Sequence, residues 1–202
     1  MRLQDYNLIF TVVGLIGVLL IATPTLSAVL HLQSLPSGEQ FSELYILGPG
    51  HMAEGYPSNV VVGKNYSIYV GVGNHVGSSA YYVLYFKFGN RTDPLPNATS
   101  NVPSPLKSLY EYRLFIQDGR IWETPLTFSI TSASFLGNQS LISNLMINNV
   151  VFNVNKPAVK EVNSTRLGYQ LLFELWIYNS QSGSIEYNNR FVRLQLNLTR
   201  NS

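Results

Sequence analysis

The 202-residue sequence contains no cysteine, which excludes disulfide bonds and thiolate metal sites. Charged side chains are also scarce, because Asp, Glu, Lys and Arg together make up 12% of the residues and the formal net charge is +2. Without a basic run, this charge gives no electrostatic footprint for nucleic acid. Uncharged polar residues must therefore supply much of the surface, and the folded part must be stabilised by its core.

The amino-terminal region lacks charge between Asp5 and Glu39. Residues 8–32 are almost wholly apolar or small, and a helix of about 23 residues covers about 34 Å, against a bilayer core of about 30 Å. We therefore predict one transmembrane signal-anchor helix at 8–32. Because positive residues favour the cytoplasm, residues 1–7 with Arg2 are expected inside the cell membrane and the remaining chain outside.

A cleaved signal peptide is the alternative for the same segment, with cleavage near residues 25–27. We favour a retained single-pass anchor because the apolar run is longer than the core of about 7–15 residues that is usual in signal peptides. Either outcome exports the remainder of the chain.

The exported part begins with a linker at 33–42 that contains Pro, Gly and Ser. From 43 to 202 the dominant hydrophobic period is two, which is typical of half-buried strands. Seven to nine strands separated by turn signals predict one all-β domain, an immunoglobulin-like or jelly-roll β-sandwich. Apolar residues of two strands share one face each: Tyr66, Ile68, Val70 and Val72, and Val192, Leu194, Leu196 and Leu198.

Turn signals between these runs predict two β-hairpins. The first joins 65–72 to 80–88 through GNHVGSS, and the second joins 109–116 to 121–130 through Asp118-Gly119. Two further strand-like runs, 169–178 and 190–198, flank a polar segment. Because proline cannot donate a ladder hydrogen bond, Pro125 indicates that part of its strand lies at a sheet edge or in a bulge. One exception to the β pattern is a predicted short helix with Leu141, Ile142, Leu145 and Met146 on one face.

Six Asn-x-Ser/Thr sequons lie beyond the predicted anchor, about twice the number expected from chance placement. We predict N-linked glycans on an exported surface that has little charge. The alternative is that an Asn- and Ser-rich surface generates unused sequons. The predicted acceptors are Asn65, Asn90, Asn97, Asn138, Asn163 and Asn197.

No catalytic motif is recognisable, and we predict that the protein is not an enzyme and holds no metal or cofactor. His51-x-x-Glu54 supplies only two ligands, so a solvated loop is favoured over a metal site. His31 belongs to the membrane boundary and His75 to a turn. The glycines of GVGNHVG join two strands and lack the spacing of a dinucleotide-binding loop.

Aromatic residues are abundant, with 13 Tyr, 10 Phe and 2 Trp. Trp122 and Trp176 are candidates for sugar-stacking platforms if their rings face outward. Core packing is favoured for both because their neighbours are apolar. A row of exposed tyrosines would favour glycan binding.

Eight residues between 43 and 89 form a pattern within ELYILGPG and the following GYPSNVVVGKNYSIYVGVGNHVGSSAYYVLYFKFG: Tyr45, Gly48, Tyr56, Pro57, Gly63, Gly73, Asn74 and Tyr82. Through them the segment resembles the archaeal domain-of-unknown-function 1616 family. It is also similar to adhesion-related immunoglobulin-like domains. The family has no established activity, and the resemblance implies an archaeal cell-envelope setting.

We therefore expect a non-enzymatic, membrane-anchored and glycosylated cell-envelope protein. Its expected role is that of an accessory or interaction subunit of a membrane or surface-layer complex, in contact with membrane lipid and other envelope proteins. One alternative is a carbohydrate-binding surface module. Another is a secreted filament or bacteriocin-like subunit, which requires cleavage after the apolar segment.

Overall fold

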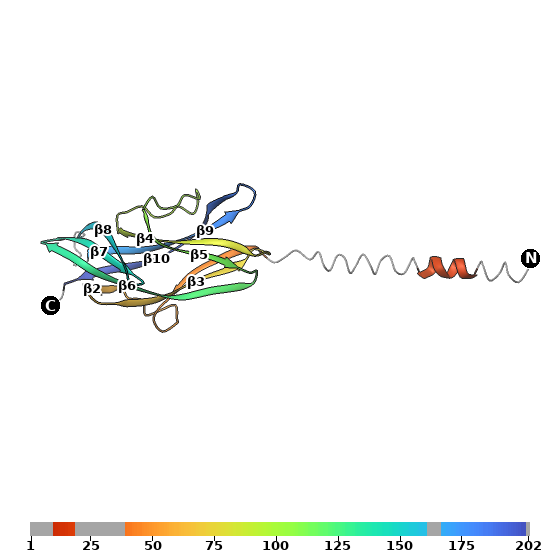
Figure 1. Cartoon of the computed structure of the whole chain (residues 1–202), viewed down its shortest axis with the longest axis horizontal. Coiled ribbons are helices and arrows are strands. Elements are labelled where there is room, and N and C mark those ends of the chain that lie inside the picture. Colours follow the sequence, from red (N-terminus) through yellow and green to blue (C-terminus); the bar gives the residue numbers. More distant parts are fainter. Residues whose placement is uncertain (1–9, 19–38, 161–166, 201–202) are drawn as a thin grey trace, which may run out of the picture. The chain divides into compact units, whose positions relative to one another are not determined.

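The computed structural model describes residues 10–18, 39–160 and 167–200 (Figure 1). Residues 10–18 are helical and belong to one compact unit, whereas residues 40–202 form a second. Among the described residues, no helix combines the length and hydrophobicity needed to cross a bilayer. Most of the predicted anchor and linker lies outside the described residues.

The second unit is built from two five-stranded sheets (Figure 1). The β-sandwich predicted from the hydrophobic period is confirmed, with ten strands in the described part of the domain. All strand pairs are antiparallel except β2–β10. Sheet A has the order β1 (Phe41–Leu47), β3 (Tyr66–His75), β6 (Arg120–Leu136), β7 (Gln139–Ile147) and β8 (Val150–Val159). Sheet B has the order β2 (Asn59–Val61), β10 (Ser184–Thr199), β9 (Leu167–Asn179), β4 (Ala80–Asn90) and β5 (Ser108–Ile116).

The core lies between the sheets and follows the period of two, because alternate side chains of a strand point to opposite faces. Phe86 of β4 is fully buried near its centre, with the rings of Tyr110, Tyr112 and Phe173 at centroid distances of 5.1–5.5 Å. The two predicted apolar faces are confirmed by buried residues on β3 and β10: Ile68, Val70, Val72, Leu194, Leu196 and Leu198.

Both predicted hairpins are wrong. β3 belongs to sheet A and β4 to sheet B, and likewise β5 belongs to sheet B and β6 to sheet A. The turns at 76–79 and 117–119 therefore cross between the sheets instead of joining paired strands. We call the end of the domain that holds these turns and Phe41 the entry end, since Phe41 pairs with His75 there.

Asn74 links the two turns at which the chain changes sheets. Its buried side-chain Nδ2 donates to the carbonyl oxygens of Ser78 and Ile116, both at 2.8 Å. Its backbone oxygen accepts from the Gly119 N–H at 2.7 Å, and Asp118 Oδ1 accepts from the Gly77 N–H at 2.8 Å. The two crossing turns are thus bonded to each other, which no local hairpin signal reveals.

The predicted short helix is also wrong, since Leu141, Ile142, Leu145 and Met146 lie in strand β7. The pairing of β7 with β8 shifts register between Ile142 and Asn144. Such a bulge inserts one residue and reverses the face on which later side chains point. Ile142 and Leu145 therefore both face the core at a spacing of three, which imitates helical periodicity.

The strands β9 and β10 pair antiparallel along most of their length, with an irregularity between Tyr187 and Arg190. Pro125 lies in the half of β6 that pairs with β3 alone among the described strands, since β7 begins its pairing at Phe128. This position agrees with the predicted edge, where a missing N–H costs no ladder bond.

Candidate functional site on the outer face of sheet B

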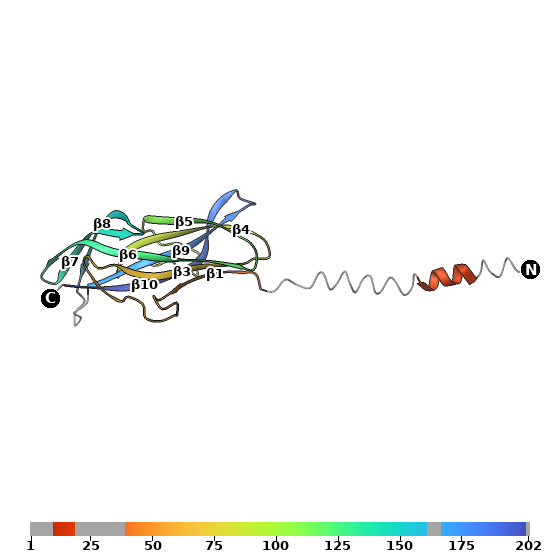
Figure 2. The same ribbon diagram turned by 60° about the horizontal axis from the view of Figure 1, so that its bottom comes forward.

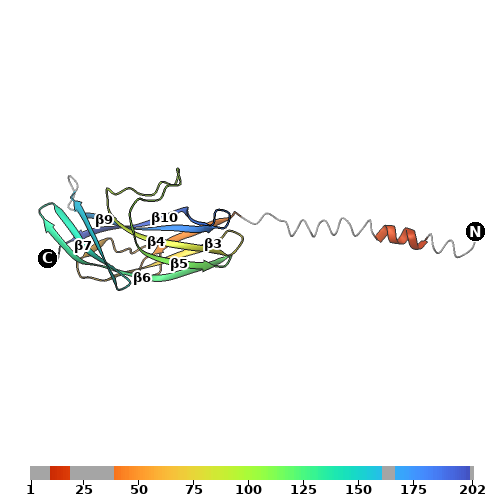
Figure 3. The ribbon, with the colours of Figure 1, turned by 45° about the horizontal axis from the view of Figure 1, so that its top comes forward.

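The β4–β5 loop, residues 91–107, lies over the outer face of sheet B, as Figure 3 shows. The Asn189 side chain of β10 donates to the Ala98 carbonyl oxygen of this loop at 2.8 Å. Loops of this length in compact domains are often functional, so the face beneath it is the first place to look for a site.

A buried ion pair fastens the loop to the sheet. Lys87 Nζ of β4 lies 2.7 Å from Glu174 Oε2 of β9, and the Glu174 side chain is fully buried. Ser104 of the loop completes the cluster, because its N–H donates to Glu174 Oε1 at 2.8 Å and its carbonyl oxygen accepts from Lys87 at 2.7 Å. Every charged atom of the pair therefore has a hydrogen-bonding or ionic partner, which it needs because it is buried away from water.

An aromatic cluster adjoins the ion pair on the same face. The Trp176 ring lies edge to face with Tyr85 at 5.6 Å and tilted against Tyr187 at 5.8 Å. Its Nε1 donates to Glu174 Oε2 at 3.3 Å. Burial, with the nearby Glu174 charge, raises the pKa of Tyr187 to about 12. The Tyr187 hydroxyl is buried without a hydrogen-bond partner among the described residues, as is Asn188 Nδ2.

A row of more exposed aromatic side chains crosses three strands at the entry end of this face. Phe115 of β5 pairs with Tyr81 of β4 and is 71% exposed. Tyr178 of β9 is 46% exposed and follows Ile177, the partner of Tyr82, so it lies beside Tyr81. We call Phe115, Tyr81 and Tyr178 the aromatic row. Arg113 lies next to the row, and hydrogen bonds from the Arg113 guanidinium to Tyr81 and Glu111 raise its pKa.

Trp122, the other predicted stacking residue, has a different position. It pairs in register with the buried Val72 of β3 and is half-buried against the core. Its ring lies 5.0 Å from that of Tyr112 of sheet B. Trp122 therefore closes the seam between the two sheets, and Trp176 is the predicted stacking residue that belongs to the outer face.

The predicted glycan acceptors differ in how far their amides are engaged. Asn65, Asn97 and Asn138 are exposed. Asn90 Nδ2 donates to the Pro157 carbonyl oxygen at 2.9 Å, and Asn197 Nδ2 donates to Asn59 Oδ1 at 2.9 Å. Since a glycan is attached at Nδ2, the first three are better placed as acceptors. The sixth, Asn163, lies outside the described residues.

The histidines form pairs rather than clusters. His51 Nε2 lies 2.7 Å from Glu123 Oε1 of β6, and its ring is edge-on to Tyr69 at 3.9 Å. His75 stacks on Phe41 at 4.8 Å. Across the part of the chain that the structure describes, no three His, Asp or Glu side chains are grouped to hold a metal. His31 lies outside that part.

Sequence reasoning missed the aromatic row and the buried ion pair. Each depends on which residues of β4, β5 and β9 lie side by side, and this register follows from the sheet order. One signal was available, since Tyr81, Val83, Tyr85 and Lys87 alternate with the core residues Tyr82, Leu84, Phe86 and Phe88 of β4. The pattern shows that they share a face but not what covers it.

These features define a two-sheet β-sandwich domain with an aromatic outer face that is partly roofed by one loop. The chain belongs to the family described as Domain of unknown function (DUF1616), whose model matches residues 35–149. The resemblance drawn from residues 43–89 is thereby confirmed. No curated protein matches the chain.

Solved structures similar to the chain include the CARDB domain of the PF1109 protein from Pyrococcus furiosus in complex with di-metal ions. The identity is 10% and the TM-score 0.36, over 79% of this chain and 90% of that one. A β-glucosidase from Listeria innocua in complex with glucose has an identity of 10% and a TM-score of 0.36 over 79% of this chain. The chain spans only 16% of the β-glucosidase. A PapD-like domain of human CEP192 has an identity of 8% and a TM-score of 0.30, over 80% of this chain and 86% of that one. At these levels of similarity they carry no functional inference.

Proposed function

We propose that this chain is a non-enzymatic subunit of a cell-envelope complex, in which an immunoglobulin-like domain held by the membrane anchor contacts a neighbouring membrane protein. The aromatic row is the observation that carries the proposal. Exposed Phe and Tyr beside an Arg are the residue types enriched in protein interfaces.

The position of the row supports a partner close to the membrane. Tyr81 and Phe115 adjoin Ala80 and Ile116, which pair at the entry end of the domain. The residues between the predicted anchor and β1, 33–40, reach at most about 28 Å when fully extended. A partner anchored in the same membrane is therefore within reach of this end of the domain.

Removing the row is expected to release the partner. In Phe115→Ser combined with Tyr178→Ser, the protein purified from its own membranes should retain less than about a tenth of the co-purifying partner, because hot-spot aromatics dominate interface energy. The matched control replaces two exposed apolar residues elsewhere, Leu136→Ser with Val159→Ser. Quantitative mass spectrometry of the purified complexes measures the ratio. Equal loss in the control pair contradicts the proposal.

Carbohydrate binding is the second candidate, and the Trp176 cluster favours it. Aromatic faces stack on sugars, and here Tyr85 and Tyr187 hold the Trp176 ring from two sides. On a glycan array, binding by the full-length protein that disappears with Trp176→Ala and persists with Phe115→Ser would favour this function. Absence of any glycan signal rules against this second candidate.

The glycan and anchor parts of the proposal are tested together by intact mass. We expect the native protein to retain Met1 or Arg2 and to carry glycans on Asn65, Asn97 and Asn138, whose side chains are exposed. Asn90→Gln and Asn197→Gln should leave the mass almost unchanged, whereas Gln at any of the three exposed sites removes one glycan. A mass that lacks about the first 25 residues refutes the anchor and favours the secreted filament subunit.

A further inference from the structure

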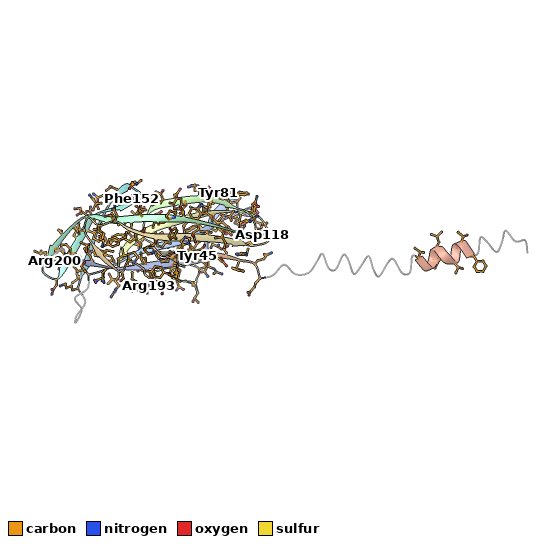
Figure 4. All side chains as sticks on the ribbon, turned by 90° about the horizontal axis from the view of Figure 1, so that it is seen from below. Tyr45, Tyr81, Asp118, Phe152, Arg193 and Arg200 are labelled. Atoms are coloured by element: carbon orange, nitrogen blue, oxygen red, sulfur yellow. The ribbon has the colours of Figure 1, made fainter. Side chains whose placement is uncertain are left out.

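A groove of about 620 Å³ separates β1, at the edge of sheet A, from β10 of sheet B. Its lining residues do not include the aromatic row, which crosses β9, β4 and β5. Figure 2 shows β1 and β10 near each other along the lower side of the domain, and Figure 4 shows Tyr45 and Arg193, which both line the groove. Its volume falls within the range of about 300–1,000 Å³ that is usual for binding sites.

The β1 wall of the groove is already occupied. Its Ser42 carbonyl oxygen accepts from Arg190 Nε at 3.2 Å, and its Ile46 carbonyl oxygen accepts from the Tyr56 hydroxyl at 2.9 Å. The carbonyl groups of alternate residues, Ser42, Leu44 and Ile46, point to the free edge of β1, and two of these three are thus bonded. β1 is therefore protected against a further strand in the way that natural sheet edges are.

The β10 wall is open. β2 pairs with β10 only at Asn197, Leu198 and Thr199, and among the described strands β10 has β9 as its sole other neighbour. The Asn197 N–H donates to the Ser58 carbonyl oxygen, so backbone groups at odd-numbered positions face this edge. Along Phe191–Gln195, about 16 Å of strand, the N–H and C=O groups of Arg193 and Gln195 therefore face the groove.

The side chains around this edge specify what would fit. Leu44, Ile46 and Val192 are half-buried and pack on the core, so they form an apolar floor. Of the residues that line the groove, Arg193 alone is charged, and it is exposed on the outer side of β10. A second copy pairing through the same edge centred on Arg193 would place two arginines opposite each other, which is unfavourable.

We infer that the groove is a strand-addition site for an extended peptide segment of another protein with alternating apolar, acidic and apolar side chains. The segment extends the line of β2 and hydrogen-bonds to the β10 backbone, while its acidic residue faces Arg193 and its apolar residues cover the floor. This inference deepens the proposed interaction function and uses a different surface from the aromatic row.

Fluorescence anisotropy of the full-length protein in nanodiscs tests the inference with a labelled peptide that has a Val-Glu-Val core. We expect it to bind about tenfold more tightly than a Val-Lys-Val peptide, and Arg193→Glu to reverse the preference. A peptide methylated at the backbone nitrogens of this core should not bind, because it cannot donate to the β10 edge. Arg120→Glu, at an exposed site on β6, is the matched control and should change neither affinity.

Each other outcome overturns the inference. Binding that survives N-methylation assigns the groove to apolar side chains or a small apolar ligand, and equal binding of both peptides removes the role of Arg193. A dimer that Arg193→Glu dissociates assigns the edge to a second copy, and absence of binding by every peptide refutes strand addition. Phe115→Ser with Tyr178→Ser should leave peptide binding intact, so failure here is separable from failure of the proposed function.

Discussion

Replacing Glu174 by leucine is expected to lower the free energy of unfolding by about 3–5 kcal/mol. The variant leaves the Lys87 ammonium buried with a single carbonyl acceptor from Ser104, and it leaves the Ser104 N–H without its partner. Removing one member of a buried pair leaves the other charge buried and uncompensated. The loss of stability should therefore far exceed the loss when a surface pair is broken. Urea unfolding of the full-length protein, followed by far-UV circular dichroism, measures it.

The same experiment contains its own controls. Lys87→Met with Glu174→Leu removes both charges and should recover most of the lost stability, since apolar replacements of a buried pair are often neutral. Glu111→Leu breaks the exposed pair with Arg113, at 2.7 Å, and should change stability by less than about 0.5 kcal/mol. If the double variant is no more stable than Glu174→Leu, the pair is not the source of the effect.

The consequence for function is that the loop and the sheet form one unit. Glu174 bonds the loop through Ser104 and orients Trp176 through its indole N–H. A Glu174 variant should therefore disturb the Trp176 cluster while leaving the aromatic row, which lies beyond the loop at the entry end. This separates carbohydrate binding at Trp176 from partner binding at Phe115 and Tyr178.

The sequence predicted the layers of the fold better than the connections between strands. Alternation on β3 and β10 identifies the core-facing residues correctly, because the period of a strand is a local property. Whether β3 pairs with β4 is a tertiary choice, and the Asn74 bond to the Ile116 carbonyl oxygen, 42 positions away, is a contact that no local pattern reveals. The bulge in β7 is also a tertiary feature. It changes the spacing of the core-facing residues where the pairing with β8 shifts register.

The family pattern has a structural explanation at several of its positions. A Cβ at Gly48 would collide with the backbone oxygen of Glu54, and Gly63 has a φ of 81°, a conformation that favours glycine. The Tyr45 hydroxyl donates to Glu123 Oε2 at 3.0 Å, and burial with this bond raises the pKa of Tyr45 to about 12. Tyr82 donates to Asn74 Oδ1 at 3.1 Å. These residues build the sandwich, and none of them belongs to the aromatic row. The candidate site lies on neighbouring residues that share no recognisable motif.

Asn74→Ala is expected to be the most damaging change at the entry end, lowering the free energy of unfolding by about 3–5 kcal/mol. It removes two donors from the carbonyl oxygens of Ser78 and Ile116, and the acceptor used by Val76 N–H and the Tyr82 hydroxyl. Because Asn74 is fully buried, the partners that lie inside the domain cannot turn to water instead.

A graded series attributes this loss to the bonds of Asn74. Tyr82→Phe removes one donor from the network and should cost about 1 kcal/mol, whereas Asn74→Asp keeps the acceptor but loses both donors and buries a charge, so it should match or exceed alanine. Asn153→Ala, on the exposed face of the edge strand β8, should fall within about 0.5 kcal/mol of wild type. If Asn74→Ala also falls within that margin, the two crossing turns are held by the strands they connect, and Asn74 follows the change of sheet without causing it.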